Sequence, residues 1–229
     1  MRGAHLFLPL ILTGCAQQAL VSPEVETQEL AKADDQLYAE TSLVEREGHV
    51  FTLAKGRARR EKDTLVLTTD VGHRIRLTDL ADCKKPGVTD CASYEMAAWL
   101  PSHHVFVVLE SYYEYYDYLL VDTHTGSLQV IADLPRYSPD GAHLATFRND
   151  EMNGGGIDVW SVRGDSLVHE WHVDDFAKFV RWQGGDVIEI GLFPEGEYAP
   201  DGKTRPAIVM HGAKGLQLRQ GTDVLKARP

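Results

Sequence analysis

The sequence has few cysteines, no long apolar run and no excess of positive charge. Only three of its 229 residues are cysteine. The chain has 23 Lys and Arg residues and 34 Asp and Glu residues, which gives a formal net charge of −11. No apolar run approaches the roughly 18–20 residues that a membrane-spanning helix needs, which excludes a protein with several membrane spans. The acidic balance argues against nucleic acid as a partner, because nucleic-acid-binding surfaces must neutralise phosphate charge.

Familiar catalytic motifs are also missing. The chain contains no Gly-x-Ser-x-Gly turn, phosphate-binding loop, His-Glu-x-x-His helix or dinucleotide-binding glycine motif. His169 and His172 look like a metal-binding pair, but regular alternation along a strand would point them to opposite faces. We therefore predict no catalytic residue, metal site or cofactor. The alternative is a degenerate hydrolase that uses Asp122, Asp140 and Asp158 in a central channel.

The N-terminus carries the most informative short motif. Arg2 precedes an apolar stretch from Leu6 to Leu12, and small residues follow it before Cys15. This order is typical of a secretory signal peptide. The segment Leu12-Thr13-Gly14-Cys15 resembles the lipobox of bacterial lipoproteins, in which the cysteine is lipidated and becomes the first residue of the mature chain.

The lipoprotein resemblance implies a place in the bacterial cell envelope. Residues 1–14 would form the removed signal peptide, and fatty acyl groups such as palmitate on Cys15 would anchor the mature chain in a membrane. Enterobacterial lipoproteins kept in the inner membrane have Asp after the cysteine, whereas this chain has Ala16. The resemblance therefore favours the outer membrane, with the protein facing the periplasm. The alternative is a buried N-terminal segment with an incidental cysteine.

The other two cysteines are Cys83 and Cys91, which flank the turn-forming stretch Lys84-Lys85-Pro86-Gly87. In an oxidising compartment, a disulfide that closes this loop is the first expectation. Free thiols or a metal pair are the alternatives. No second pair of cysteines lies nearby in the sequence to complete a metal site.

Residues 15–47 form an acidic segment unlike the rest of the chain. Between residues 16 and 47 there are eight acidic side chains, two basic ones and no glycine. Such a composition buries little surface and is typical of a tether. Leu30, Ala33 and Leu37 have helical spacing, so the tether can contain a short helix over about residues 25–39.

From residue 48 onward, short alternating segments are separated by polar turns. The segments expected to form strands are 49–53, 64–68, 73–77, 104–110, 118–122, 127–131, 143–147, 157–162, 166–173, 186–192 and 207–210. Many short strands with Asp, Gly, Pro and Ser turns predict an all-β domain over residues 48–229, built as a sandwich, barrel or propeller.

A repeat among these strands favours the propeller. Trp99, Tyr137 and Trp182 each precede an expected strand, at spacings of 38 and 45 residues that match one blade. Residues 137–147 resemble the Ser-Pro-Asp-Gly motif of WD-like repeats in TolB-type periplasmic propellers, and residues 121–127 resemble the Asp-x-x-Thr-Gly hairpin of the same repeats. The resemblance implies a β-propeller-like stack of about four antiparallel blades. The alternative is a β-sandwich in which Ser-Pro-Asp-Gly is an ordinary type I turn.

Tyrosine is concentrated in one place, because five of the nine tyrosines fall between residues 112 and 118. We take Tyr112, Tyr113, Tyr115 and Tyr116 as candidate partner-binding residues, since tyrosine forms amphipathic, hydrogen-bonding surfaces. Aromatic packing within a blade is the alternative. The sequence thus predicts a lipid-anchored envelope protein with a binding or scaffolding role, whose partner is a protein or a cell-wall ligand.

Overall fold

The computed structural model describes residues 43–80, 88–89, 91–113, 115–150, 154–164, 166–194, 203–212, 215–220 and 223–225. The expected signal peptide, Cys15, the helix at 25–39 and Cys83 lie outside these residues. Within the described chain, no helix is both long enough and apolar enough to cross a bilayer.

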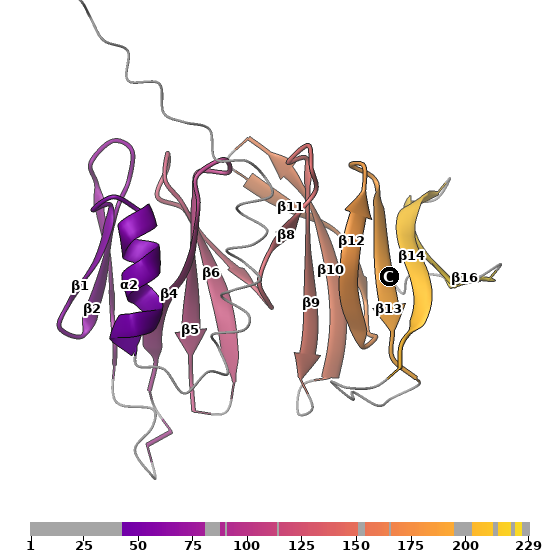
Figure 1. The fold of residues 1–229 in the computed structure, drawn as a ribbon, viewed down its shortest axis with the longest axis horizontal. Coiled ribbons are helices and arrows are strands. Elements are labelled where there is room, and N and C mark those ends of the chain that lie inside the picture. The colour runs from indigo at the N-terminus through magenta and orange to yellow at the C-terminus, as the bar shows by residue number, and fades with distance from the viewer. Residues whose placement is uncertain are drawn as a thin grey trace, which may run out of the picture.

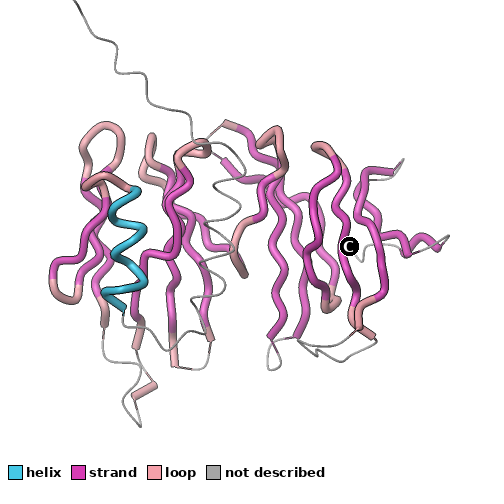
Figure 2. The backbone as a smooth tube through the Cα atoms, in the orientation of Figure 1, coloured by secondary structure: helices cyan, strands magenta, loops and turns pink. Residues whose placement is uncertain are grey.

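The described chain consists of one helix and sixteen strands (Figures 1 and 2). In chain order these are α2 (Leu43–Leu53), β1 (Ala58–Glu61), β2 (Thr64–Thr68), β3 (Arg74–Thr78), β4 (Ser93–Leu100), β5 (Val105–Ser111), β6 (Tyr116–Asp122), β7 (Leu128–Ile131), β8 (Arg136–Tyr137), β9 (His143–Asp150), β10 (Gly154–Arg163), β11 (Ser166–Val173), β12 (Ala177–Gln183), β13 (Val187–Leu192), β14 (Arg205–Gly212), β15 (Gly215–Gln220) and β16 (Asp223–Leu225).

The strands form four antiparallel sheets, and each sheet is a meander of consecutive strands. We call them blade 1 (β1–β3), blade 2 (β4–β7), blade 3 (β8–β11) and blade 4 (β12–β16). Figure 1 shows the blades following one another along the long axis, with blade 1 and blade 4 at opposite ends. The prediction of an all-β fold with about four antiparallel sheets is confirmed. The sheets stack in chain order, and among the described residues the stack is open rather than a closed ring (Figure 1).

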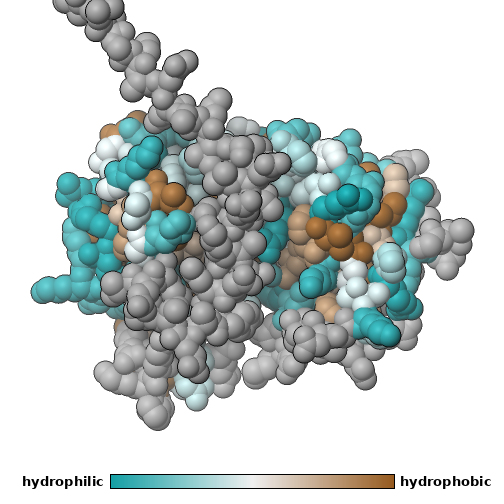
Figure 3. All heavy atoms as spheres, viewed as in Figure 1, coloured by the Kyte–Doolittle hydropathy of each residue, from teal (hydrophilic) through white to brown (hydrophobic). Residues whose placement is uncertain are grey.

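Each pair of consecutive blades encloses its own apolar core, so an inner blade is buried on both faces. In blade 2, Val107 and Leu120 pack against blade 3, whereas Phe106 and Val108 pack against blade 1. A strand with two buried faces needs apolar side chains at successive positions. This explains the unbroken apolar run of residues 105–109. Figure 3 shows hydrophilic side chains around the apolar ones over α2 and blade 4.

Helix α2 corrects one expectation from the sequence. Residues 49–53 were predicted as a strand, but they form the C-terminal half of this helix. Glu47 and Val50 are buried on one face of the helix, and Ala54 is buried directly after its last residue. Val50 and Ala54 belong to the core between blades 1 and 2. A five-residue alternation is too short to exclude a helix. The helix also runs across residue 48, where the β domain was expected to begin.

Candidate binding site

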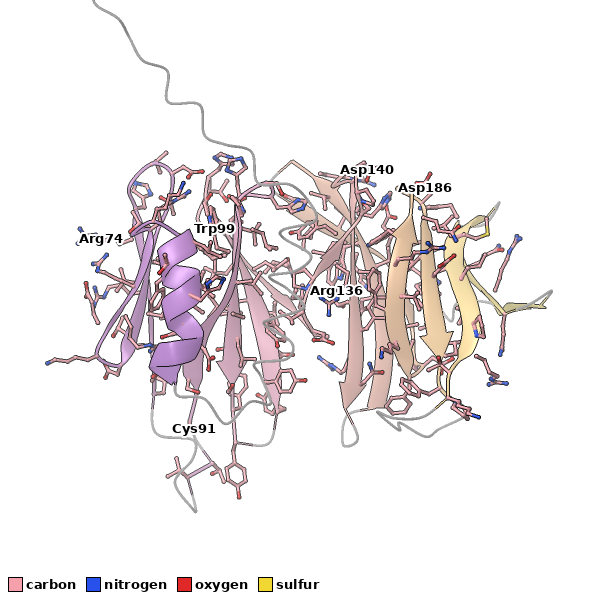
Figure 4. The ribbon with its side chains drawn as sticks, viewed as in Figure 1. Arg74, Cys91, Trp99, Arg136, Asp140 and Asp186 are labelled. Atoms are coloured by element: carbon pink, nitrogen blue, oxygen red, sulfur yellow. The ribbon has the colours of Figure 1, made fainter. Side chains whose placement is uncertain are left out.

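A histidine makes a contact across each of the three interfaces between consecutive blades, and the three histidines lie along one side of the stack. His104 lies near Asp70 across blades 1 and 2, His103 stacks on Tyr137 across blades 2 and 3, and His143 contacts Gly185 across blades 3 and 4. Figure 4 shows Asp140 and Asp186, which belong to turns of blades 3 and 4, along this same side of the stack.

At the first interface, Asp70 is the centre of a polar cluster. Thr123 donates its hydroxyl hydrogen bond to Asp70 Oδ2 over 2.9 Å, and His124 Nδ1 lies 2.9 Å from the same oxygen. Arg57 forms an ion pair with Asp70, and His104 Nδ1 lies 3.6 Å away. Burial raises the pKa of Asp70, but the Thr123 hydrogen bond and the nearby positive groups outweigh it, so the pKa is lowered overall.

We predict a pH-dependent loss of stability for Asp70→Asn. Because the folded protein lowers this pKa, the charged carboxylate stabilises the fold at neutral pH, and that contribution disappears as pH falls through the folded pKa. The variant should lose about 1 kcal/mol of unfolding free energy at neutral pH and much less at pH values below the ordinary Asp range. Urea unfolding at both pH values measures this. An equal loss at both would contradict a role for the charge.

The second interface contains a pocket with a volume of about 470 Å³. Apolar side chains of the two facing blades form part of its lining, and polar side chains border them. The polar and aromatic side chains of the lining include His103, Ser127, Gln129, Tyr137 and Ser166. Concave sites that combine apolar walls with a few placed polar groups are where ligands usually bind.

Strand β7 lies beside this pocket and is an edge strand of blade 2. Leu128 and Val130 are 49% and 51% exposed, although both are apolar. β11, which also contributes to the pocket, is an edge strand of blade 3, and its Val168 is exposed as well. Edge strands offer backbone donors and acceptors to an incoming strand. The pocket therefore adjoins two sheet edges that can accept an extended chain.

The Ser-Pro-Asp-Gly segment forms a closed turn. Asp140 Oδ1 accepts hydrogen bonds from the Ser138 hydroxyl over 2.6 Å and from the Ala142 backbone N–H over 3.1 Å. The Ser138 hydroxyl oxygen in turn accepts the backbone N–H of His143 over 2.9 Å. A side chain at Gly185 would collide with the Asp140 carboxylate, so this glycine lets the turns of blades 3 and 4 approach.

The three carboxylates of the hydrolase hypothesis each bind groups of their own blade. Asp122 Oδ1 accepts the backbone N–H groups of His124 and Thr125 and the Thr125 hydroxyl. Asp140 closes its own turn, as described, and Asp158 binds two histidines of β11. These contacts give all three side chains structural partners.

The β11 histidines correct a second expectation. Asp158 Oδ1 lies 2.8 Å from His169 Nε2 and 2.9 Å from His172 Nδ1, so both histidines face the same side. The pairing of β10 with β11 skips Glu170, which is therefore the extra residue of a β-bulge. A bulge adds one residue to the strand and shifts the alternation that follows. The argument from regular alternation was wrong for this reason.

The tyrosine cluster is divided between surface and core. Tyr112 and Tyr115 stack with ring centroids 4.4 Å apart, and Tyr113 and Tyr115 are about half exposed. Burial and a hydrogen bond to Glu110 raise the pKa of Tyr112. Tyr116 packs at the edge of the core between blades 2 and 3. The β5–β6 hairpin therefore presents only part of the predicted partner-binding set to solvent.

Cys91 is buried and disulfide-bonded, while its expected partner Cys83 lies outside the described residues. Tyr137 was singled out by the sequence repeat, but no sequence pattern marked Gln129 or Ser166, which the stacking of blades brings to the same pocket. Neither the models of known protein families nor the curated proteins include a match to this chain.

Proposed function

We propose that this chain is a lipid-anchored protein of the bacterial cell envelope that binds an extended segment of another protein between blades 2 and 3. The pocket of about 470 Å³ beside the exposed edge of β7 carries this proposal. An extended peptide can pair its backbone with an edge strand while its alternate side chains enter a neighbouring pocket. Leu128, which lines the pocket and is 49% exposed, provides an apolar contact beside that edge.

The polar residues at the pocket support a peptide as the ligand. Gln129 and Ser166 can both donate and accept hydrogen bonds, which suits the amide groups of a peptide. The stacked rings of His103 and Tyr137 give the pocket one flat aromatic side, with centroids 3.7 Å apart. The proposed role is to hold a partner at the membrane, and none of these groups needs to perform a chemical step.

The anchoring part of the proposal rests on Cys15 and is tested separately. The full chain should partition with membranes, whereas Cys15→Ala should appear in the soluble periplasmic fraction, because it has no site for acylation. Globomycin, which blocks signal-peptide removal from lipoproteins, should leave the full chain unprocessed. Unchanged localisation of the variant would overturn the lipoprotein part of the proposal and leave the pocket untouched.

The binding part is tested by site-specific photo-crosslinking in cells. A photo-reactive amino acid at Gln129 should give a discrete adduct that contains peptides of a second protein, because this residue borders the pocket. The matched control places the same group at Arg74, an exposed residue of β3 on blade 1 (Figure 4). A third placement, at the exposed Tyr113, examines the tyrosine hairpin.

An adduct at Gln129 that is absent at Arg74 supports peptide binding at the pocket. An adduct at Tyr113 alone would move the binding surface to the hairpin. An adduct in which mass spectrometry finds cell-wall sugar and no peptide of a second protein would identify a cell-wall ligand instead of a protein. Equal labelling at all three positions, or none, would contradict the proposed function.

A further inference from the structure

We propose that His143, Glu170 and His211 bind a divalent transition-metal ion such as Zn²⁺ across blades 3 and 4. One ligand atom from each residue lies within 4.8 Å of the others. The residues come from β9, β11 and β14, so the ion would link strands of two blades. Two imidazoles with one carboxylate are a ligand set that Zn²⁺ accepts, with a fourth position left for water.

The contacts of His143 prepare it as a ligand. Its Nδ1 lies 3.0 Å from the backbone carbonyl oxygen of Gly185. A carbonyl only accepts hydrogen bonds, so Nδ1 donates to it, and Nε2 is the ring nitrogen left to bind an ion. Metal-binding histidines usually donate their second N–H to such an acceptor. Trp182 also stacks on this ring, with an angle of 26° between the ring planes.

The bulge in β11 accounts for Glu170. The pairing of β10 with β11 skips this residue, and its Oε2 lies 3.9 Å from His211 Nε2. Its other oxygen, Oε1, lies 3.8 Å from Arg163, which leaves Oε2 for an ion. Bulges often re-aim a side chain toward a functional site. Ser161, directly opposite His143 on β10, has a buried hydroxyl without a hydrogen-bond partner among the described residues.

The ligand atoms must move only slightly to hold an ion. Metal–ligand distances near 2.1 Å in a tetrahedron place ligand atoms about 3.4 Å apart. The 3.9 Å between Glu170 and His211 is close to this separation, and His211 is exposed and free to adjust. The cluster around Asp70 is a poorer site, because Arg57 and Thr123 already bind its carboxylate.

The test titrates the full chain, purified with its affinity tag removed, with Co²⁺ and then with competing Zn²⁺. We expect one ion per chain, with the visible bands of tetrahedral cobalt and no thiolate charge-transfer band. His211→Ala should weaken binding by about 100-fold and Glu170→Gln by about tenfold or more, since even partners of ligands contribute this much. The matched control is His124→Ala, which removes an exposed histidine of the Asp70 cluster and should leave the affinity unchanged.

Thermal unfolding provides a second readout. Because the ion binds only the folded protein, excess Zn²⁺ should raise the Tm of the full chain and of His124→Ala, but not that of His211→Ala. Circular dichroism without metal verifies that each variant folds. Loss of binding in His124→Ala, unchanged binding in both His211→Ala and Glu170→Gln, or no cobalt spectrum for the full chain would overturn the proposal.

Discussion

Replacing Glu47 with Ala should lower the free energy of unfolding by about 3 kcal/mol, because the largely buried Arg60 loses its two-point partner and keeps only a longer ion pair, 3.6 Å, with Asp79. Glu47 is 1% exposed and binds Arg60 through both carboxylate oxygens, at 2.6 and 2.7 Å. It also accepts the backbone N–H of Met96 over 2.8 Å. Arg60 further bonds the Tyr94 carbonyl. One ion pair therefore connects α2, β1 and β4.

Chemical unfolding followed by circular dichroism measures this loss. The matched control is Glu61→Ala, which removes another arginine-bound glutamate, since Glu61 pairs with Arg59 and Arg76 on the exposed side of blade 1. Solvent-exposed ion pairs contribute little, so the control should change stability only slightly. Similar losses in the two variants would contradict the importance of burial at Glu47.

Tyr118→Ala should cost about 3–5 kcal/mol, the range for removing a large aromatic side chain from a core. Tyr118 is 1% exposed and packs in the core between blades 2 and 3. Its ring also meets Tyr116 edge-on, with centroids 5.9 Å apart. Thermal or urea unfolding gives the magnitude.

A neighbouring tyrosine provides the control for this prediction. Tyr113→Ala removes a ring that is 48% exposed and should change stability by less than about 0.5 kcal/mol. If the two variants were equally destabilised, the division of this cluster into core and surface would be wrong. A stable Tyr113→Ala protein is also suitable for binding experiments, because any loss of binding would not come from unfolding.

The fold class could be predicted because most strands alternate regularly or are buried on both faces. The expected strand at 64–68 is β2, and the expected segment 104–110 largely coincides with β5. Strands β4 and β12 were not predicted, although Trp99 and Trp182 lie near their ends. Each contains a break in register, after Met96 in β4 and after Phe179 in β12. A bulge disturbs the two-residue period on which strand prediction depends.

The sites were harder to predict than the strands. Local motifs identified turns, and Asp122 and Asp140 prove to be bonded within turns. The pocket and the histidine cluster arise where separate blades meet, and single-sequence patterns report only local periodicity. Glu170 is the clearest example, because the direction of its side chain depends on a β-bulge that no sequence pattern predicted.

The open arrangement of blades has a consequence for how the chain can fold. In a ring, the first blade cannot complete its packing until the last one arrives. Among the described residues, each of the three apolar cores joins blades that are consecutive along the chain, so each core can form as soon as the next blade emerges. Contacts between near neighbours in sequence also carry a low loop-closure cost and favour rapid folding. Such a chain can fold vectorially, so that its first blades pack together while the later blades are still emerging.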